Sequence, residues 1–488
     1  MKIYLLPFIL YLLSPFQVLS AEVSEDSQDC IGCHEYVTPG IFADWKESRH
    51  SKFTPAEGMA KDTLAKRISA GQVDENLAKT VVGCAECHTL NAEKHPGSFE
   101  HNGYTVHTVV SPRDCATCHP VEVEEYKDNL MNQAYGNLMH NPTYLKMVDA
   151  VNGLHEYEKG TITFHGSDEA NNNDSCLSCH GTDVRITGTE TRDTEMGEMD
   201  FPTLANWPNI GVGRVNPDGT VGSCSPCHAR HQYSIEVARK PYTCGQCHKG
   251  PDVPAYKVYS ASVHGNIQKS IDKNWNFEAV PWIAGADFTA PTCATCHISL
   301  VVDQEGEILV ERSHRMNNRL PWRLFGLPYA HPHPISADTT VIVNEAGLHL
   351  PNELSGEPVS KYLIDAKEME IREQTMKNVC LGCHSSQWVE GHFNRLDVSI
   401  ASTNHMTLQA TKMIVDAWKQ GLADDTNPFN EAIEVMWTEQ WLFYGNSTRL
   451  ASAMGGTDYG VFDRGRWWQH KNLQQIHDHM QLLQNLKK

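Results

Sequence analysis

All sixteen cysteines of the chain lie in Cys-x-x-Cys-His motifs, and no other sequence feature constrains the fold as strongly. The eight motifs are Cys30/Cys33/His34, Cys84/Cys87/His88, Cys115/Cys118/His119, Cys176/Cys179/His180, Cys224/Cys227/His228, Cys244/Cys247/His248, Cys293/Cys296/His297 and Cys380/Cys383/His384. Histidine accounts for only 26 of the 488 residues. Its presence after all eight cysteine pairs by chance therefore has odds of about 10⁻¹⁰.

The spacing within each motif matches the covalent attachment of haem c. Two thioether bonds to one porphyrin need sulfur atoms about one helical turn apart, and the next histidine then lies under the iron. We therefore predict eight haem c groups, held by the sixteen cysteines, with the motif histidines as proximal iron ligands. A zinc site would need four ligands for each ion and would not require the histidine. A disulfide within one motif would close a small, strained ring.

The predicted haem load limits the kind of core that this chain can form. About 60 residues are available for each haem, which is too few to enclose every porphyrin in protein alone. Hydrophobic residues make up 40% of the chain, in agreement with a core that the porphyrins partly supply. The expected fold class is mainly α, a multihaem cytochrome c architecture with a haem-packed core and a helical C-terminal region.

The first twenty residues have the pattern of a secretory signal peptide. Lys2 precedes an apolar run over residues 3–13, and the small residues Ser20 and Ala21 precede an acidic stretch. We expect residues 1–20 to direct export to the periplasm and to be removed. An uncleaved membrane anchor is the alternative, although the run is shorter than a membrane span needs.

The charge balance narrows the choice of partners. The chain has 60 acidic residues against 40 lysines and arginines. Binding to nucleic acid needs a positive surface, so we expect no nucleic-acid partner. A redox partner with a positive docking face is the natural expectation for such an acidic protein.

Histidines outside the motifs are candidates for the sixth ligand of each iron. A weak internal repeat places a histidine after an aromatic–lysine pair that follows a motif, and this repeat predicts ligands of neighbouring haems. His231 lies three residues after the proximal His228, so it cannot reach the far face of the same haem and would ligate an adjacent one. For each candidate, a solvated or hydrogen-bonded surface histidine is the alternative. The candidates are His50, His140, His231, His264, His314 and His392.

The character of the sequence changes after the last motif. Apolar residues recur at helical spacing over residues 408–422, 433–442 and 473–483. We expect an octahaem domain over residues 21–402 and a haem-free helical region over residues 403–488. Between the motifs, residues 171–173, 217–219 and 328–334 have the composition of loops. Residues 301–310 have the pattern of a small β-hairpin.

The chain resembles the octahaem hydroxylamine oxidoreductase family, whose last five haems correspond to those of pentahaem nitrite reductases. The most specific stretches are residues 222–265, with CSPCHARH, ARKPYTCGQCHKGPD and YSASVHG, and residues 446–462, with NSTRLASAMGGTDYGVF. The resemblance implies that the fourth motif, Cys176/Cys179/His180, holds the catalytic haem. It also implies homotrimers in which the C-terminal helices of the subunits meet.

The same resemblance implies catalytic residues on the open face of that haem. The family carries an Asp-His pair just after the sixth motif; here Asp252 matches the aspartate and Val253 replaces the histidine. Asp252 is a candidate proton relay, or else a turn residue after Pro251. Tyr329 is the candidate for a distal tyrosine. Tyr459 is either the tyrosine that the oxidative branch cross-links to a neighbouring subunit's porphyrin, or a packed aromatic residue.

Three functions are compatible with these patterns. The first is reduction of nitrite or hydroxylamine to ammonium, favoured by the missing histidine at Val253. The second is oxidation of hydroxylamine or hydrazine, which requires a bond between Tyr459 and the porphyrin. The third is a non-enzymatic electron carrier in which all eight irons have six ligands. In the enzymatic cases, electrons would pass to or from a small soluble cytochrome or a membrane quinol-linked cytochrome.

Overall fold

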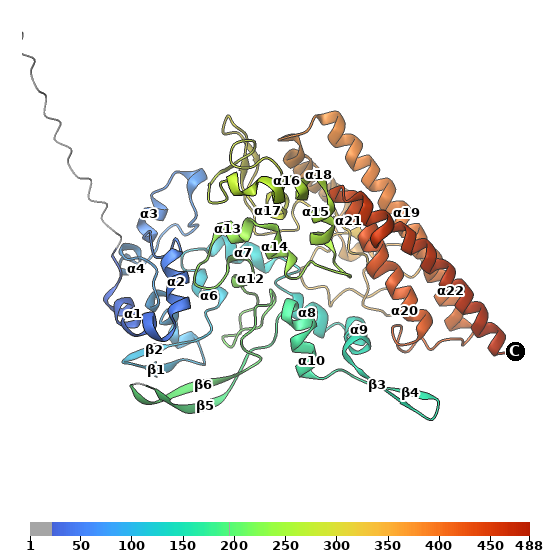
Figure 1. Ribbon diagram of the computed structural model, residues 1–488, viewed down its shortest axis with the longest axis horizontal. Helices are drawn as coiled ribbons and strands as arrows, with labels where there is room; N and C mark the ends of the chain where they lie inside the picture. Colours follow the sequence, from blue (N-terminus) through green and yellow to red (C-terminus); the bar gives the residue numbers. More distant parts are fainter. Residues whose placement is uncertain (1–21, 195) are drawn as a thin grey trace, which may run out of the picture.

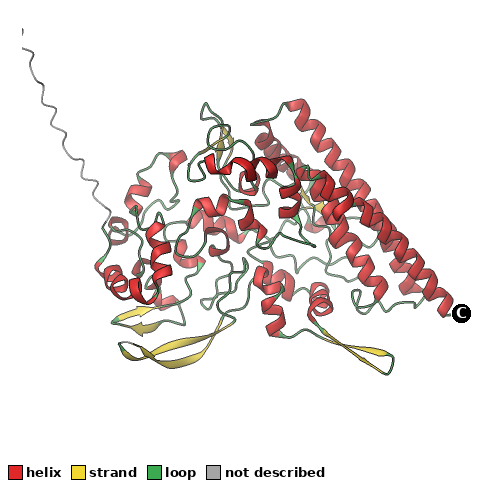
Figure 2. Ribbon diagram, viewed as in Figure 1, coloured by secondary structure: helices red, strands yellow, loops and turns green. Residues whose placement is uncertain are grey.

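The computed structural model describes residues 22–194 and 196–488, and the signal peptide expected over residues 1–20 lies outside them. Short helices joined by long loops form the haem-motif region, as the predicted fold class requires (Figure 2). In chain order these helices are α1 (Glu25–Val37), α2 (Pro39–Glu47), α3 (Pro55–Met59), α4 (Glu75–Lys79), α5 (Ala85–His88), α6 (Pro112–Cys115), α7 (Pro120–Lys127), α8 (Ala134–Met139), α9 (Pro142–Asn152), α10 (Glu169–Asp174), α11 (Cys176–His180), α12 (Ser225–His228), α13 (Ile235–Arg239), α14 (Pro241–Gly245), α15 (Ala255–Ala261), α16 (Val263–Ile271) and α17 (Cys293–His297). None of the helices in the described part of the chain combines the length and the apolarity of a membrane span.

Several motifs lie on a single turn of helix. Helices α11 and α17 each span one complete motif, and α5 and α12 each end at a motif histidine. In helix α17, reciprocal hydrogen bonds between Thr292 and Thr295 fix the first turn. Residues at positions i, i+3 and i+4 of a helix share one face. The two cysteines and the histidine of a motif therefore project to the same side.

Two long antiparallel hairpins project from the haem-motif region at the bottom of Figure 1. The first joins β3 (Leu154–Glu158) to β4 (Thr161–His165), and the second joins β5 (Arg185–Thr194) to β6 (Gly197–Ala205). The sequence analysis predicted neither hairpin. Shorter antiparallel pairs are formed by β1 (Phe99–His101) with β2 (Tyr104–Val106), and by β10 (Trp322–Arg323) with β11 (His331–Pro332).

Two local sequence predictions have opposite outcomes. The hairpin expected over residues 301–310 is confirmed, because β8 (Val301–Val302) pairs antiparallel with β9 (Ile308–Val310), and β7 (Trp282–Ile283) extends this sheet. The loop expected over residues 171–173 is wrong, since these residues lie in α10. The Asp168 carboxylate accepts a hydrogen bond from the Asn171 amide and caps the start of that helix.

The C-terminal helices form a separate group, coloured orange to red in Figure 1. They are α18 (Ala366–Leu381), α19 (Ser386–Lys419), α20 (Ala432–Thr438), α21 (Asn446–Met454) and α22 (Arg466–Leu486), with π-helical turns over Glu439–Gly445 and Tyr459–Asp463. Helix α19 has 34 residues and begins directly after the eighth motif. The boundary expected between residues 402 and 403 therefore falls inside this continuous helix.

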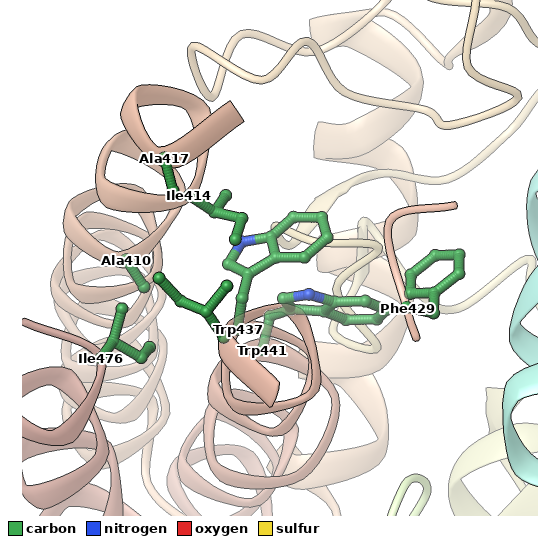
Figure 3. Packing of buried hydrophobic residues seen from close by; sticks show 8 residues of the cluster. Ala410, Ile414, Ala417, Phe429, Trp437, Trp441 and Ile476 are labelled. Carbon is green, nitrogen blue, oxygen red and sulfur yellow. The ribbon is translucent and has the colours of Figure 1, made fainter. Parts of the chain in front are cut away.

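Helices α19, α20 and α22 share a hydrophobic core that contains no motif residue (Figure 3). The Ile414 and Trp437 side chains meet between α19 and α20, and Ile476 closes the cluster from α22. The Trp437 ring also donates a hydrogen bond of 2.9 Å to the Thr411 hydroxyl. The buried members are Ala410, Ile414, Ala417, Phe429, Ile433, Trp437, Trp441 and Ile476.

Truncation of this core tests whether the C-terminal helices are stabilised by their own packing. Ile476 is fully buried, so Ile476→Ala is expected to lower the free energy of unfolding by about 2–5 kcal/mol. Leu486→Ala is the matched control, because Leu486 lies on the same helix and is 75% exposed. Urea unfolding followed by far-UV circular dichroism measures both. Equal effects of the two substitutions would contradict the assignment of this core.

Candidate haem-binding and catalytic site

One continuous cavity of about 1610 Å³ runs through the haem-motif region. Side chains from the second to the eighth motif line it, and its walls are mostly apolar. Protein interiors are otherwise close-packed, with few voids larger than a water molecule. The motif cysteines, the motif histidines and the apolar walls fit a set of covalently bound porphyrins, which would form the core of this region.

The motif thiols lie close to one another across motif boundaries. None of the sixteen thiols is in a disulfide. Three contacts between thiols join the third motif to the fifth, the fourth to the sixth and the sixth to the seventh; they are Cys115–Cys224, Cys179–Cys247 and Cys244–Cys293. Other thiol pairs are near enough for each to affect the pKa of its neighbour; they are Cys30–Cys84, Cys87–Cys118, Cys227–Cys244 and Cys296–Cys380. These pairs therefore link the motifs in the order first, second, third, fifth, sixth, seventh and eighth. The fourth motif joins this series through its contact with the sixth.

Three pairs of histidine rings have the separation expected for two ligands of one iron. With metal–nitrogen bonds of about 2 Å, trans imidazoles have ring centres roughly 6.3 Å apart. The ring centres are 6.2 Å apart for His34–His101, 6.3 Å for His50–His119 and 6.1 Å for His264–His384. This geometry agrees with the predictions for His50 and His264. It adds His101, which the sequence analysis did not single out.

A fourth pair of histidine rings has the same separation, but a hydrogen bond, and not a shared iron, accounts for it. The rings of His88 and His107 are 6.1 Å apart, but the Nδ1 atom of His88 lies 2.8 Å from the backbone oxygen of His107. The Nε2 atom, which would bind iron, therefore points away from His107. Burial lowers the pKa of His88 to about 4, and His231 is one of the charged groups that add to this shift. His231 is thus the candidate for the opposite face, as the sequence predicts.

His107, His95 and Asp114 form a buried polar cluster. His95 stacks on His107 with ring centres 3.6 Å apart and planes 2° from parallel. The His107 Nε2 atom lies 3.6 Å from one carboxylate oxygen of Asp114. The His95 Nε2 atom lies 3.1 Å from a carboxylate oxygen of Asp114. We interpret this cluster as support for the loop whose carbonyl binds His88.

Two more histidines, His314 and His333, each lie beside a motif histidine. Within the described part of the chain, neither of those motif histidines has another histidine ring at the separation expected for two ligands of one iron. Burial lowers the pKa of His314 to about 4, and the next cause is His228 of the fifth motif. Burial also lowers the pKa of His333, and His297 of the seventh motif is among its charged neighbours. Both His314 and His333 line the cavity, and their buried Nδ1 atoms have no hydrogen-bond partner among the described residues. His314 was predicted, whereas His333 was missed, although the sequence His-Pro-His-Pro over residues 331–334 was a usable signal.

The remaining two predicted ligands have less suitable surroundings. His140 is exposed at the end of α8, and its ring packs edge-on against Tyr135 at 5.6 Å. No motif histidine lies beside it in the described structure at the trans distance. His392 lines the cavity, but its Nε2 atom lies 3.2 Å from the Ala453 carbonyl oxygen. Neither geometry supports the assignment of an iron to these two residues.

The fourth motif differs from the others in the groups that surround its histidine. The Nδ1 atom of His180 lies 3.2 Å from the Ala134 carbonyl oxygen, which leaves Nε2 for iron. Burial lowers the pKa of His180, Asp252 acts in the opposite sense, and Arg323 adds to the decrease. Among the described residues, the one histidine near enough to interact with His180 is His248 of the sixth motif, and no histidine from outside the motifs does so. His180 thus has a carboxylate and a guanidinium among its charged neighbours.

Asp252 and Arg323 reach this place from different parts of the chain. Asp252 lies in the loop between α14 and α15, Arg323 is in β10, and both line the cavity. The Arg323 guanidinium makes no ion pair with the described residues, and burial lowers its pKa. A buried guanidinium without a carboxylate partner is costly unless an anion binds to it. The site therefore has a strong donor for an anion and a carboxylate that can exchange protons.

Two further residues surround Arg323 and were not predicted. Tyr144 of α9 lines the cavity, and burial raises its pKa to about 12, so its hydroxyl stays protonated. His331 is fully buried, and its Nε2 atom has no hydrogen-bond partner among the described residues. Arg323 lies near enough to lower the pKa of His331. Tyr144 lies in no sequence motif, whereas His331, in β11, is the first residue of the His-Pro-His-Pro sequence.

The sixth motif is the closest comparison for the fourth, since Asp252 is also a charged neighbour of His248. The His248 ring faces Phe325 with centres 6.1 Å apart and planes at 21°. A phenyl ring offers neither a metal ligand nor a proton. The fourth motif has Arg323 among its charged neighbours as well, and is therefore better equipped to bind and protonate a substrate.

The two tyrosines predicted to be catalytic do not line the cavity. Tyr329 is buried, and its hydroxyl donates a hydrogen bond of 3.1 Å to the Leu354 carbonyl oxygen. Tyr459 is also buried and packs with Val258, Leu450 and Ala451 of its own chain. The position of Tyr459 matches a packed aromatic residue, one of the two alternatives that the sequence left open.

Comparisons with known proteins agree with the geometry of the motifs. The family described as "Seven times multi-haem cytochrome CxxCH" matches residues 216–327. The family described as "Cytochrome c554 and c-prime" matches residues 23–110 and 114–200. With the connected motifs and the apolar cavity, these matches define the chain as a multihaem c-type cytochrome that binds haem c covalently.

Solved structures and curated relatives narrow this class. A solved structure titled "Hypothetical multiheme protein" is 39% identical, covers 96% of this chain and 98% of its own, and has a TM-score of 0.90. A reducing HAO-like protein complex of Kuenenia stuttgartiensis has the same fold, with a TM-score of 0.62 over 95% of this chain and 86% of its own at 18% identity. A probable nitrite reductase-hydroxylamine oxidoreductase fusion protein of the same organism is 25% identical over 75% of this chain. This chain spans about a third of that relative, 35% of its length. The chain belongs to the multihaem c-type cytochromes, and it is similar to hydroxylamine oxidoreductase-like proteins of this class.

Proposed function

We propose that this protein is a periplasmic cytochrome with eight haem c groups that reduces nitrite and hydroxylamine to ammonium. The observation that carries the proposal is that Asp252 and Arg323 are both charged neighbours of His180, which has no histidine from outside the motifs among its charged neighbours in the described residues. A relative with a name that includes nitrite reductase and hydroxylamine oxidoreductase supports this substrate class.

The residues of the site match the needs of this reaction. When bound, the haem iron supplies electrons and a position for the substrate nitrogen. Nitrite is an anion, and the Arg323 guanidinium can bind its oxygen atoms through two parallel hydrogen bonds. Reduction to ammonium also consumes protons, and the Asp252 carboxyl group can accept protons from water and deliver them to the bound substrate.

The oxidative alternative requires a bond between Tyr459 and the porphyrin of a neighbouring subunit. Tyr459 is only 6% exposed, and it contacts Leu450 and Ala451 in its own chain. Its hydroxyl would have to leave this cluster before it could reach another subunit. For this reason we favour reduction over oxidation of hydroxylamine or hydrazine.

The proposed activity is tested with purified holoprotein and a reduced dye as electron donor. We expect oxidation of the dye to depend on nitrite or on hydroxylamine, and ammonium to accumulate in proportion. Haem attached to a small monohaem cytochrome is the control for direct reaction of the dye with substrate. If ammonium forms from neither substrate, the protein does not have this function.

Replacement of Arg323 separates the anionic substrate from the neutral one. For Arg323→Gln, we expect the KM for nitrite to rise about 10- to 100-fold, as loss of a charged hydrogen bond predicts. The KM for hydroxylamine, which is neutral at pH 7, is expected to stay within about threefold. Steady-state assays with both substrates measure the difference.

The same experiment distinguishes substrate binding from haem binding. A haem propionate is also an anion, and an arginine that held it would affect both substrates and the haem content equally. Arg323→Lys retains the charge and is expected to show a smaller rise in the KM for nitrite than Arg323→Gln. Equal changes for nitrite and hydroxylamine would argue against a role in nitrite binding.

A further inference from the structure

A buried polar network links the C-terminal helices to the walls of the fourth-motif site. Asn404 lies on α19, and Asn446 and Arg449 lie on α21. Asn446 and Arg449 are fully buried. Arg449 forms no ion pair with any carboxylate of the described residues, and burial lowers its pKa to about 9. Burial of a cation without a carboxylate partner costs free energy of folding. The hydrogen bonds of Arg449 therefore need an explanation beyond the packing of helices.

Arg449 binds the segment that follows Arg323. Its Nε atom donates to the Leu324 carbonyl oxygen at 2.8 Å. Its Nη1 and Nη2 atoms donate to the side-chain oxygens of Asn404 at 3.0 Å and of Asn446 at 2.8 Å. The guanidinium therefore fixes one backbone atom directly and orients two asparagines.

The two asparagines bind the rest of the segment that follows Arg323, and one of them also binds the loop that contains Asp252. Asn404 exchanges two hydrogen bonds of 3.0 Å with the backbone of Ala330. The Asn446 oxygen accepts a hydrogen bond of 2.8 Å from the Gly326 amide, and its Nδ2 atom donates to the Asp252 carbonyl oxygen at 3.0 Å. One side chain thus ties the Asp252 loop to the segment between Arg323 and His331.

Close packing at Gly326 supports the same arrangement independently. A Cβ atom at this position would lie 2.3 Å from the Arg449 Nη2 atom and 2.6 Å from the Pro328 carbonyl oxygen. Only glycine therefore allows the segment to approach Arg449 this closely. The backbone of residues 324–330 is shaped to fit the network.

We propose that Arg449, Asn446 and Asn404 are positioning residues that set the relative places of Asp252 and Arg323 at the fourth haem. The inference rests on the proposed reduction of nitrogen compounds at that haem. The network binds backbone atoms of both walls, so the Asp252 and Arg323 side chains remain free for substrate. Misplacement of a catalytic group by about 1 Å can reduce a rate about 100-fold. The C-terminal helices, which carry no haem motif, thereby contribute to catalysis.

The central experiment compares two buried asparagines of the C-terminal helices. Asn446→Ala removes the link to Asp252, whereas Asn472→Ala removes bonds to Met436 and Gln440 within the helices. We expect both variants to show a similar fall in melting temperature. Only Asn446→Ala is expected to lower kcat for nitrite and hydroxylamine, by about 10- to 100-fold, with the haem content unchanged.

A second variant keeps the proposal testable if Asn446→Ala fails to fold. Asn446→Asp retains the oxygen that accepts from Gly326 and Arg449 but loses the donor to Asp252. We expect normal folding and a kcat reduced at least about fivefold. The proposal is overturned if Asn446→Asp has the kcat of the wild type, or if Asn472→Ala loses as much activity as Asn446→Ala.

Cyanide binding separates this inference from the proposed function. Cyanide enters as neutral acid and must lose a proton to bind iron, so its binding rate reports on Asp252 without turnover. If the wild type reduces neither substrate, the proposed function fails. A cyanide binding rate that falls at least about fivefold in Asn446→Asp but not in Asn472→Ala would still support positioning. Equal rates in all three proteins would overturn it.

Discussion

Chain produced in cells that cannot attach haem c is expected to lack a stable fold in the haem-motif region. The cavity of about 1610 Å³ lies where a protein of this size would have its core, and seven of the eight motifs line it. Without porphyrins, this apolar surface has nothing to pack against. Because a native domain is stable by only about 5–15 kcal/mol, the loss exceeds what the remaining contacts can supply. Far-UV circular dichroism and thermal unfolding of the haem-free chain measure the effect.

Motif variants provide the matched comparison for this prediction. The seventh motif lies in the cavity, so Cys293→Ser with Cys296→Ser is expected to prevent folding of the haem-motif region. The first motif is not among the residues that line the cavity. Cys30→Ser with Cys33→Ser is therefore expected to leave a folded protein with one haem fewer. Cooperative unfolding of the haem-free chain at the melting temperature of the holoprotein would refute the role of haem as core.

The features that the sequence predicts best are those set by local chemistry. A cysteine pair and its histidine fit on one turn of helix, so α11 and α17 follow directly from their motifs. The apolar repeat over residues 408–422 predicts the buried face of α19, where Ile414 is buried and Val415 and Trp418 pack against the same cluster. Both patterns depend on neighbours within a few residues. No knowledge of the rest of the chain is needed to interpret them.

The pairing of histidines across haems depends on contacts that are distant in sequence. His50 faces a motif histidine 69 positions later, and His264 faces His384. The repeat that singled out these two residues also singled out His140, which is exposed. A histidine after an aromatic–lysine pair is thus a local similarity, and the tertiary fold decides whether it meets an iron.

The candidate catalytic residues also divide into those that local sequence indicates and those that only contacts distant in sequence bring together. Asp252 follows the sixth motif closely, and the family resemblance was sufficient to find it. Arg323 and His331 flank the segment that Arg449 and Asn404 hold. Arg323 is a charged neighbour of His180, and His331 is near Arg323. The segment between these two residues is the one that α19 and α21 approach. The sequence shows the residues of this network but gives no reason to connect them.

Replacement of Asp252 is expected to have the largest effect of any single side chain on turnover. For Asp252→Asn, we expect ammonium formation from nitrite and hydroxylamine to fall about 10²- to 10⁴-fold, the range for loss of a general acid–base group. Asparagine has nearly the same shape and keeps the backbone that Asn446 binds. The haem content, optical spectrum and melting temperature are therefore expected to match the wild type. Steady-state assays with the reduced dye measure the rates.

Two comparisons decide whether the loss reflects proton delivery. Asp200→Asn changes an aspartate of the β5–β6 hairpin that does not line the cavity, and its activity is expected to equal that of the wild type. In Asp252→Asn, Arg323 still binds nitrite, so KM should change little while kcat falls. The double variant with Arg323→Gln is expected to lose less than the product of the single effects, because both groups act on one bound substrate. A kcat within about threefold of the wild type would exclude Asp252 as the proton donor.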